Sequence, residues 1–241
     1  MQENEVRLNK YLSQVGVCSR READRMIELN KVYVNGEVAT LGTKVTKEDK
    51  IIVNGKEVQH KDEEIVLALN KPVGIECTTD LSNKDNIISF LNYPKRVFMV
   101  GRLDKKSQGL ILLTNNGQLS DKLMRAANYH EKEYIVTVDK PVTEEFVKAM
   151  AGGVKLYDEE HKIDTVTRKC DVRKISKYTF SIVFTQGLNR QIRRMCEVND
   201  YQVTKLERVR IMNVNLKDLP IGKYREVKGE ELLKLKKSLG L

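Results

Sequence analysis

The sequence of 241 residues has few groups that could hold a metal ion. Its four cysteines stand far apart without a Cys-x-x-Cys pair, and its three histidines do not group beside them, so no metal site is predicted. Scattered, unpaired cysteines fit a reducing compartment, and we expect a cytoplasmic protein. The four cysteines are Cys18, Cys77, Cys170 and Cys196.

The sequence also lacks a long apolar run and a glycine-rich nucleotide loop. Its longest apolar stretches have the length of a strand, so no membrane span is predicted. The polar opening, residues 1–5, has no signal-peptide core, and we expect no secretory signal. None of the fourteen glycines belongs to a G-x-G-x-x-G turn or a P-loop, and we expect no cofactor.

Acidic residues are outnumbered: 34 Asp and Glu stand against 43 Lys and Arg, a formal net charge of +9. Between Arg168 and Arg210, eleven basic residues accompany four acidic ones. This balance suits a polyanionic partner such as RNA. Charge runs are more often solvated surface, however, so charge alone leaves both interpretations open.

The N-terminal segment predicts a small α/β module. Apolar residues recur at helical spacing over 8–15, and a second helix is predicted to begin at Ser19, where Glu22 completes a capping-box pattern. Two Asn-Gly dipeptides, at 35–36 and 54–55, predict tight hairpins because both residue types tolerate positive φ.

A charged stretch at 60–64 is the best linker candidate and predicts two domains, 1–62 and 63–241. The order of elements after it favours a mixed, largely antiparallel sheet flanked by helices over a doubly wound parallel sheet, so the predicted fold class is α+β. The predicted strands are 65–69, 97–100, 109–114, 133–138, 168–175, 178–185 and 202–211, and the predicted helices are 118–126, 143–151, one starting near Asn189, and 230–239.

The segment Gly101-Arg102-Leu103-Asp104 places one carboxylate in a loop between two predicted strands. Loops held by rigid strands are where chemistry concentrates. The alternative is a turn-capping aspartate that pairs with a neighbouring lysine. The loop by itself leaves both interpretations open.

Four blocks, in the expected order, resemble the motifs of the RNA pseudouridine synthases that carry an N-terminal S4 domain. Gly101-Arg102-Leu103-Asp104 resembles the catalytic motif of that family, and the first segment resembles its small S4 (αL-type) RNA-binding domain. The sequence of the last of the four blocks is most similar to that of family members that act on 23S ribosomal RNA. The other three blocks are Leu69–Gly74, His130–Val136 and Gln186–Glu197.

The resemblance implies an isomerase that converts a uridine of RNA into pseudouridine, and it implies three catalytic residues. Asp104 is the reactive carboxylate, and Arg193 is the guanidinium that favours its ionised form. Tyr134 is the aromatic residue that lies against the flipped uracil. Without the motif, Tyr134 would be interpreted as a half-buried packing residue.

Basic residues around the first two predicted helices resemble the RNA-facing surface of S4 domains. Arg102 resembles the residue that braces the gap left by the extruded nucleotide, whereas Arg190 and Arg194 should lie on other faces than Arg193 and suit phosphates. The alternative for Arg102 is a structural ion pair, and for the others it is ordinary surface charge. The predicted RNA-binding residues are Arg7, Lys10, Arg20, Arg21, Arg25, Arg102, Arg190 and Arg194.

Two other polar residues of these blocks are not assigned to the chemistry. Lys71, next to Pro72, is expected to shape the turn after the first strand of the second domain. His130 has no nucleophile pattern around it and is expected to be a surface or RNA-contacting side chain.

Several alternatives remain open. Within the family, 16S ribosomal RNA or transfer RNA could replace 23S ribosomal RNA as the target. An S4-bearing RNA methyltransferase would need the glycine-rich cofactor turn that the sequence lacks. A non-catalytic RNA-binding or ribosome-assembly factor would keep the fold without the activity. We expect a monomer that binds ribosomal RNA.

Overall fold

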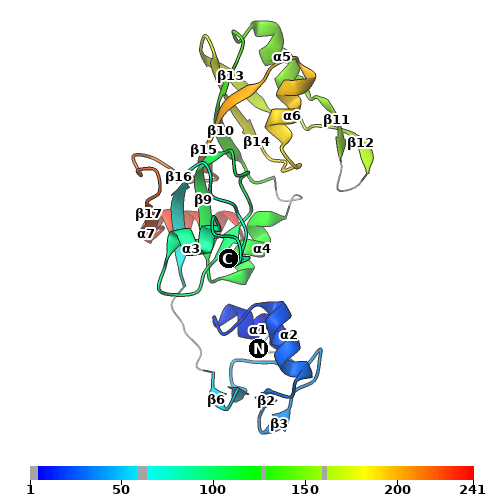
Figure 1. Cartoon of the computed structure of the whole chain (residues 1–241), viewed down its shortest axis with the longest axis vertical. Coiled ribbons are helices and arrows are strands. Elements are labelled where there is room, and N and C mark those ends of the chain that lie inside the picture. The colour runs from blue at the N-terminus through cyan, green and yellow to red at the C-terminus, as the bar shows by residue number, and fades with distance from the viewer. Residues whose placement is uncertain (1–4, 59–63, 126–128, 159–161) are drawn as a thin grey trace. The chain divides into compact units, whose positions relative to one another are not determined.

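A computed structural model describes residues 5–58, 64–125, 129–158 and 162–241. They form two compact units: one lies within 1–65 and adds 93–97 and 115–117, and the other comprises 66–92, 98–114 and 118–241 (Figure 1). The predicted domain boundary and all of the predicted linker except Glu64 fall in 59–63, outside the described residues. Within the described ranges, every helix is too short or too polar to cross a bilayer.

The N-terminal unit packs two helices, α1 (Leu8–Gln14) and α2 (Arg20–Glu28), against short strands through one apolar core. A four-stranded sheet has the order β3-β2-β5-β6, and β1 pairs separately with β4. The strands are β1 (Val6–Arg7), β2 (Val32–Val34), β3 (Glu37–Val38), β4 (Lys44–Val45), β5 (Ile51–Val53) and β6 (Lys56–Glu57).

Local signals predicted this unit well. The Ser19 hydroxyl accepts a hydrogen bond from the Glu22 amide at 3.1 Å, which confirms the predicted start of α2. Both Asn-Gly hairpins are confirmed, with left-handed φ values of 52° and 90° at 35–36 and of 50° and 75° at 54–55. The antiparallel pairing of β2 with β5 joins the two hairpins into one sheet.

The second unit is built on a mixed sheet in the order β13-β14-β10-β15-β9-β7-β17, with β8 paired to β9 and β16 paired to β15. All its pairings are antiparallel except that of β15 with β9. The predicted α+β class is therefore confirmed. The strands are β7 (Val66–Lys71), β8 (Phe98–Val100), β9 (Gln108–Thr114), β10 (Lys132–Val138), β13 (Asp171–Ser176), β14 (Thr179–Phe184), β15 (Val203–Ile211), β16 (Val214–Asn215) and β17 (Tyr224–Glu226).

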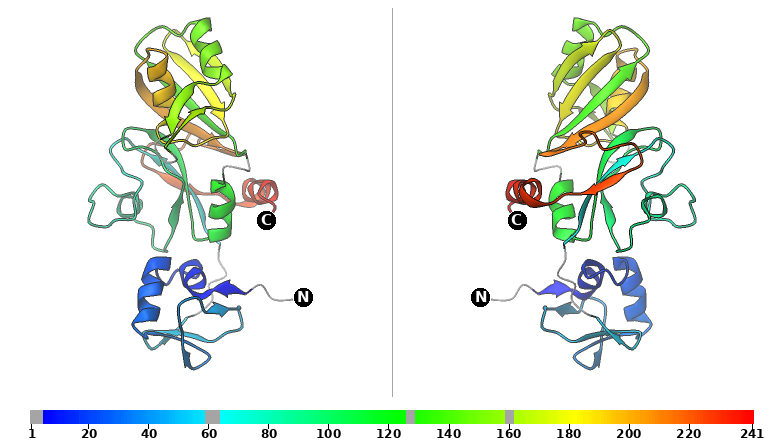
Figure 2. Two further views of the ribbon diagram at one scale, coloured as in Figure 1. Left: turned by 90° about the vertical axis from the view of Figure 1, so that its right-hand side faces the viewer. Right: turned by 90° about the vertical axis from the view of Figure 1, so that its left-hand side faces the viewer.

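Helices cover the two halves of this sheet separately. Helices α4 (Gly117–Met124) and α7 (Gly229–Ser238) lie side by side and bury leucines against β7 and β9 (Figure 2). Helices α5 (Glu144–Gly152) and α6 (Gln191–Val198) accompany the half that contains β13, β14 and β10 (Figure 1). The central strands β10 and β15 connect the halves.

Periodicity did not predict the shortest elements. They include β1 and β4 of the N-terminal unit, α3 (Ile87–Leu91), the hairpin of β11 (Lys155–Asp158) with β12 (Ile163–Val166), and strands β16 and β17. Elements of two to five residues are too short to show a hydrophobic period. Tertiary pairing and packing define them instead.

Candidate active site

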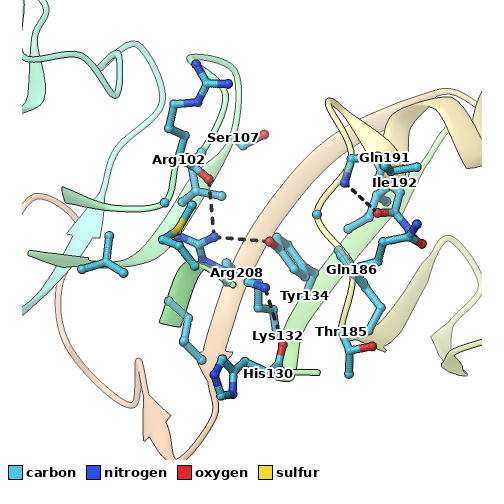
Figure 3. A pocket seen from close by; sticks show the side chains of 18 of the residues that line it. Arg102, Ser107, His130, Lys132, Tyr134, Thr185, Gln186, Gln191, Ile192 and Arg208 are labelled. Atoms are coloured by element: carbon cyan, nitrogen blue, oxygen red, sulfur yellow. Dashed lines mark hydrogen bonds between the residues drawn. The ribbon is translucent and has the colours of Figure 1, made fainter. Parts of the chain in front are cut away.

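A cavity of about 230 Å³ opens in the second unit where the two halves of the sheet meet (Figure 3). Its walls come from the loop after β8, the start of β10, the segment between β14 and α6, and β15. Its volume suits a single nucleobase-sized group rather than a folded RNA. The sequence-predicted catalytic residues Asp104 and Tyr134 line it, and Arg193 lies next to Asp104.

Backbone contacts hold the loop that carries Asp104. The Asp104 carbonyl accepts a hydrogen bond from the Ser107 amide at 3.0 Å, and the Lys105 carbonyl accepts one from Gly74 at 2.8 Å. The Leu103 amide donates to the Cys77 sulfur at 3.3 Å. The side chain of Asp104 is 35% exposed, so its carboxylate is held in place and can still be reached from the cavity.

Arg193 connects α6 to this loop. Its Nη2 donates to the Lys106 carbonyl at 3.1 Å and to Ser107 Oγ at 3.3 Å, and its Nη1 donates to the Val203 carbonyl at 3.1 Å. Its Nε lies 4.0 Å from Asp104 Oδ2. Burial lowers the pKa of the guanidinium, and the nearby carboxylate partly offsets that effect.

The close approach of β9 to β15 depends on Gly109. Its φ is 105°, and a Cβ at this position would lie 2.3 Å from the Arg208 carbonyl oxygen and 2.6 Å from the Arg208 amide nitrogen. A side chain is therefore excluded on conformational and steric grounds. Glycine at this position lets the parallel pair form and brings Arg208 Nη1 within 3.5 Å of the Arg102 carbonyl, in the loop that carries Asp104.

Tyr134 lies on β10 directly opposite Arg208 on β15. Its ring stacks on Phe184, with ring centroids 5.2 Å apart and an interplanar angle of 9°. Arg208 Nη1 donates to the Tyr134 hydroxyl at 3.3 Å, a contact visible in Figure 3. The ring is buried on one side by Phe184 and faces the cavity, so Tyr134 is more enclosed than the half-buried packing residue of the alternative interpretation.

Comparisons with known proteins show the family of this chain. The family of RNA pseudouridylate synthases matches residues 65–198, and the S4 domain matches residues 6–51. The chain belongs to the RNA pseudouridine synthase family. Its second unit holds most of the pseudouridine synthase match, and the cavity described above lies within that unit.

Individual relatives of this pseudouridine synthase extend over most of its length. The dual-specificity RNA pseudouridine synthase RluF of Escherichia coli (strain K12) is 53% identical over 97% of this chain and 79% of the relative. Ribosomal large subunit pseudouridine synthase B of Bacillus subtilis (strain 168) is 36% identical over 95% of each chain. A crystal structure of a pseudouridylate synthase superposes with a TM-score of 0.68 at 30% identity, covering 95% of this chain and 99% of that one.

The second unit, called the synthase unit below, contains three residues that were predicted to bind RNA, and each lies in a different setting. Arg102 is exposed at the cavity wall. Arg190 has a left-handed φ of 46°, directly precedes α6 and lines the cavity, so the argument from helix faces does not apply to it. Arg194 is not a lining residue and donates to the carbonyls of Asn189 and Tyr157.

His130 was predicted to be a surface or RNA-contacting side chain; it is not on the surface, and an RNA contact stays a prediction. It is buried, lines the cavity, and its Nε2 is hydrogen-bonded to the Lys122 carbonyl at 3.0 Å. Lys71 behaves as expected for a turn residue, because its Nζ donates to the carbonyls of Pro72 and Ile75 at 2.8 Å each.

In the N-terminal unit, called the S4 unit below, the predicted RNA-binding residues lie on or beside the first two helices. Arg7 ends β1, Lys10 lies in α1, and the other three lie in α2. Arg20 and Arg21 are exposed in the first turn of α2, where the helix dipole disfavours positive charge. Helix stability therefore does not explain their position.

The cavity residues that were not predicted include Lys132, Gln191 and Arg208. Lys132 stands two positions before Tyr134 in a strand, and this spacing places both side chains on one face, a signal that the sequence does contain. Gln191 accepts from the Leu188 amide at 3.1 Å and so fixes the segment before α6. No local pattern marks Arg208.

Proposed function

We propose that this enzyme isomerises a specific uridine of 23S ribosomal RNA to pseudouridine, with Asp104 acting on the ribose of the flipped nucleotide. The observation that carries the proposal is the position of Asp104. Its carboxylate faces a nucleobase-sized cavity and lies 4.0 Å from a buried guanidinium.

The reaction moves uracil from an N1 linkage to a C5 linkage on the same ribose. It consumes no redox equivalent and transfers no external group, so one carboxylate, a site that retains the loosened base and a means of extruding the nucleotide are sufficient. Asp104 serves as nucleophile or base toward the sugar. Arg193 supplies the opposite charge and anchors the loop, while Tyr134 lies against the uracil ring.

The remaining cations of the second unit are proposed to hold the RNA. Arg102, at the cavity wall, braces the duplex where the nucleotide leaves it, and Arg190 and Arg194 bind backbone phosphates. In the S4 unit, Arg7, Lys10, Arg20, Arg21 and Arg25 are proposed to form a second phosphate-binding surface.

The choice of target rests on the relatives. One relative is named for the large ribosomal subunit, and another is named as a dual-specificity RNA pseudouridine synthase. Transfer RNA stays a second candidate substrate class. We propose that the protein acts as a cytoplasmic monomer with functional domains 1–62 and 63–241. All four of its cysteines are free, which fits a reducing compartment.

The test is to map pseudouridines in ribosomal and transfer RNA from cells with and without this protein, then repeat the reaction with purified protein. Asp104→Asn should fold and bind RNA normally but form no product in a single turnover, because it removes the charge with little change in volume. Asp121→Asn, on an exposed face of α4, serves as the control and should be fully active. Product from Asp104→Asn, or no site that depends on the wild-type protein, would contradict the proposal.

A further inference from the structure

The inner wall of the cavity carries two cationic side chains, Lys132 and Arg208, and neither has a carboxylate partner among the residues that the structure describes. Arg208 is 3% exposed and donates only to neutral acceptors: the Leu110 carbonyl at 2.6 Å, the Arg102 carbonyl at 3.5 Å and the Tyr134 hydroxyl. Its Nη2 is buried without a hydrogen-bond partner.

Arg210 lies on the same strand as Arg208, but its charge is balanced by carboxylates. Arg210 binds Glu133 at 2.8 Å and Glu131 at 3.0 Å, and these carboxylates raise the pKa of its guanidinium. Lys132 and Arg208, by contrast, have no carboxylate partner among the described residues. Burial and the adjacent Arg208 lower the pKa of Lys132 to about 8.

An uncompensated charge in a partly dehydrated site destabilises the fold unless a ligand supplies the opposite charge. The reaction proposed above creates such a charge inside the cavity. When the C1′–N1 bond breaks, its electron pair stays with the uracil, and the resulting anion spreads its charge over the ring nitrogen and the two carbonyl oxygens. In the proposed complex the uracil ring lies against Tyr134. The side chains of Tyr134 and Lys132 lie on the same face of β10.

We propose that the Lys132 ammonium binds a carbonyl oxygen of the uracil and stabilises the anion formed when the glycosidic bond breaks. Arg208 is a positioning residue in this scheme: it holds the Tyr134 hydroxyl and adds positive potential beneath the ring. C5 then bonds to C1′, the C5 proton is lost and N1 is protonated, so the net change is an isomerisation. The inference rests on the proposed function.

A competing role for Lys132 is that of a neutral amine that removes the C5 proton. The two roles require opposite protonation states, so their pH dependences have opposite signs. The titratable and charged groups around Lys132 in the cavity are His130 just before β10, Tyr134 on β10, Arg208 on β15, Asp104 and Arg102 in the loop after β8, Arg125 after α4, and Arg190 before α6.

The experiment compares wild type with Lys132→Met and Lys132→Arg in single-turnover reactions on a ribosomal RNA fragment that contains the mapped uridine. Lys132→Met should lose about 10²-fold in rate at saturating RNA with unchanged RNA affinity, because only the transition state carries the anion. Lys132→Arg should keep most of the rate, because it keeps the charge. Lys174→Met, exposed on β13, is the matched control and should match wild type.

The pH dependence supplies the second readout. For wild type, kcat/KM should fall as the pH rises through about 8, where free Lys132 loses its proton, and this fall should be absent in Lys132→Arg. If Lys132→Met reacts at the wild-type rate, the inference about Lys132 is wrong and the proposed function is unaffected. An inactive Lys132→Arg together with a wild-type rate that rises through that pH would assign the base role instead. If wild type modifies none of the RNAs, the proposed function fails and the inference fails with it.

Discussion

The two units use the same residue type in opposite environments. Arg25 in the S4 unit has a side chain that is 76% exposed and a single contact with Glu22 at 3.6 Å. Arg193 in the synthase unit is 10% exposed, and three of its hydrogen bonds hold separate segments of backbone and a serine. An exposed guanidinium contributes mainly charge, whereas a buried one contributes geometry as well.

The difference predicts how each region responds to substitution and to salt. Exposed cations act on phosphates through a potential that salt screens, so their number matters more than their identity. Cations in the cavity are shielded from salt and fixed by neighbours, so each has a separate role. The following predictions test this contrast.

Arg193→Lys should give the largest effect. Lysine retains the charge but cannot reach the Lys106 and Val203 carbonyls together while its charge faces Asp104, so the single-turnover rate should fall by about 10²-fold or more. Rapid-quench measurement of pseudouridine formation at saturating RNA checks this. Arg194→Lys, the adjacent residue outside the cavity wall, should stay within about threefold of wild type. A reversed order of the two effects would show that Arg194, not Arg193, supports the catalytic loop.

Lys132→Met should stabilise the protein while it damages catalysis. The pKa of Lys132 is about 8 in the fold and 10.5 when unperturbed, so below pH 8 the fold carries a poorly solvated ammonium. Between these values the unfolded chain binds more protons, and wild-type stability rises with pH. The variant should therefore be more stable by about 1 to 3 kcal/mol at pH 7, and this gain should vanish above pH 10.5.

Chemical denaturation at several pH values measures this effect. The exposed S4 lysine in Lys31→Met provides the comparison and should change stability by less than about 0.5 kcal/mol at any pH. An equal response of the two variants would remove the distinction between the cavity and the S4 surface.

Replacing Arg20, Arg21 and Arg25 together by Gln should weaken RNA binding by about tenfold at moderate salt. Because three phosphate contacts are lost, the slope of log Kd against log salt should decrease by about 2 to 3. The single-turnover rate at saturating RNA should remain that of wild type. Binding titrations across a salt series test this, and parallel salt dependences would mean that α2 does not contact the RNA backbone.

Arg25→Lys should give the smallest effect and is the direct counterpart of Arg193→Lys. The charge and the exposed position are retained, so RNA affinity should change by less than about twofold and the free energy of unfolding by less than about 0.5 kcal/mol. A large loss of affinity would indicate that Arg25 makes a bidentate contact that lysine cannot reproduce.

The sequence alone determined the local features of this protein. Hairpins at the Asn-Gly dipeptides, the start of α2 at Ser19 and the strand–loop–strand setting of Asp104 all follow from interactions within a few residues, and the structure has each of them. The order of the motifs that indicated the family could also be identified from the sequence alone. The burial of His130 was not predicted because its environment includes cavity-lining segments from other parts of the chain.

Only the tertiary structure decided which charges are buried together. The parallel pairing of β9 with β15, made possible by Gly109, brings Arg208 to the Leu110 carbonyl across 98 positions of sequence. That approach changes the electrostatics of Lys132, whose strand position was predictable but whose lowered pKa was not. Local geometry follows from the identity of neighbouring residues, whereas solvation and the field at a side chain are sums over all the groups that the fold brings near it.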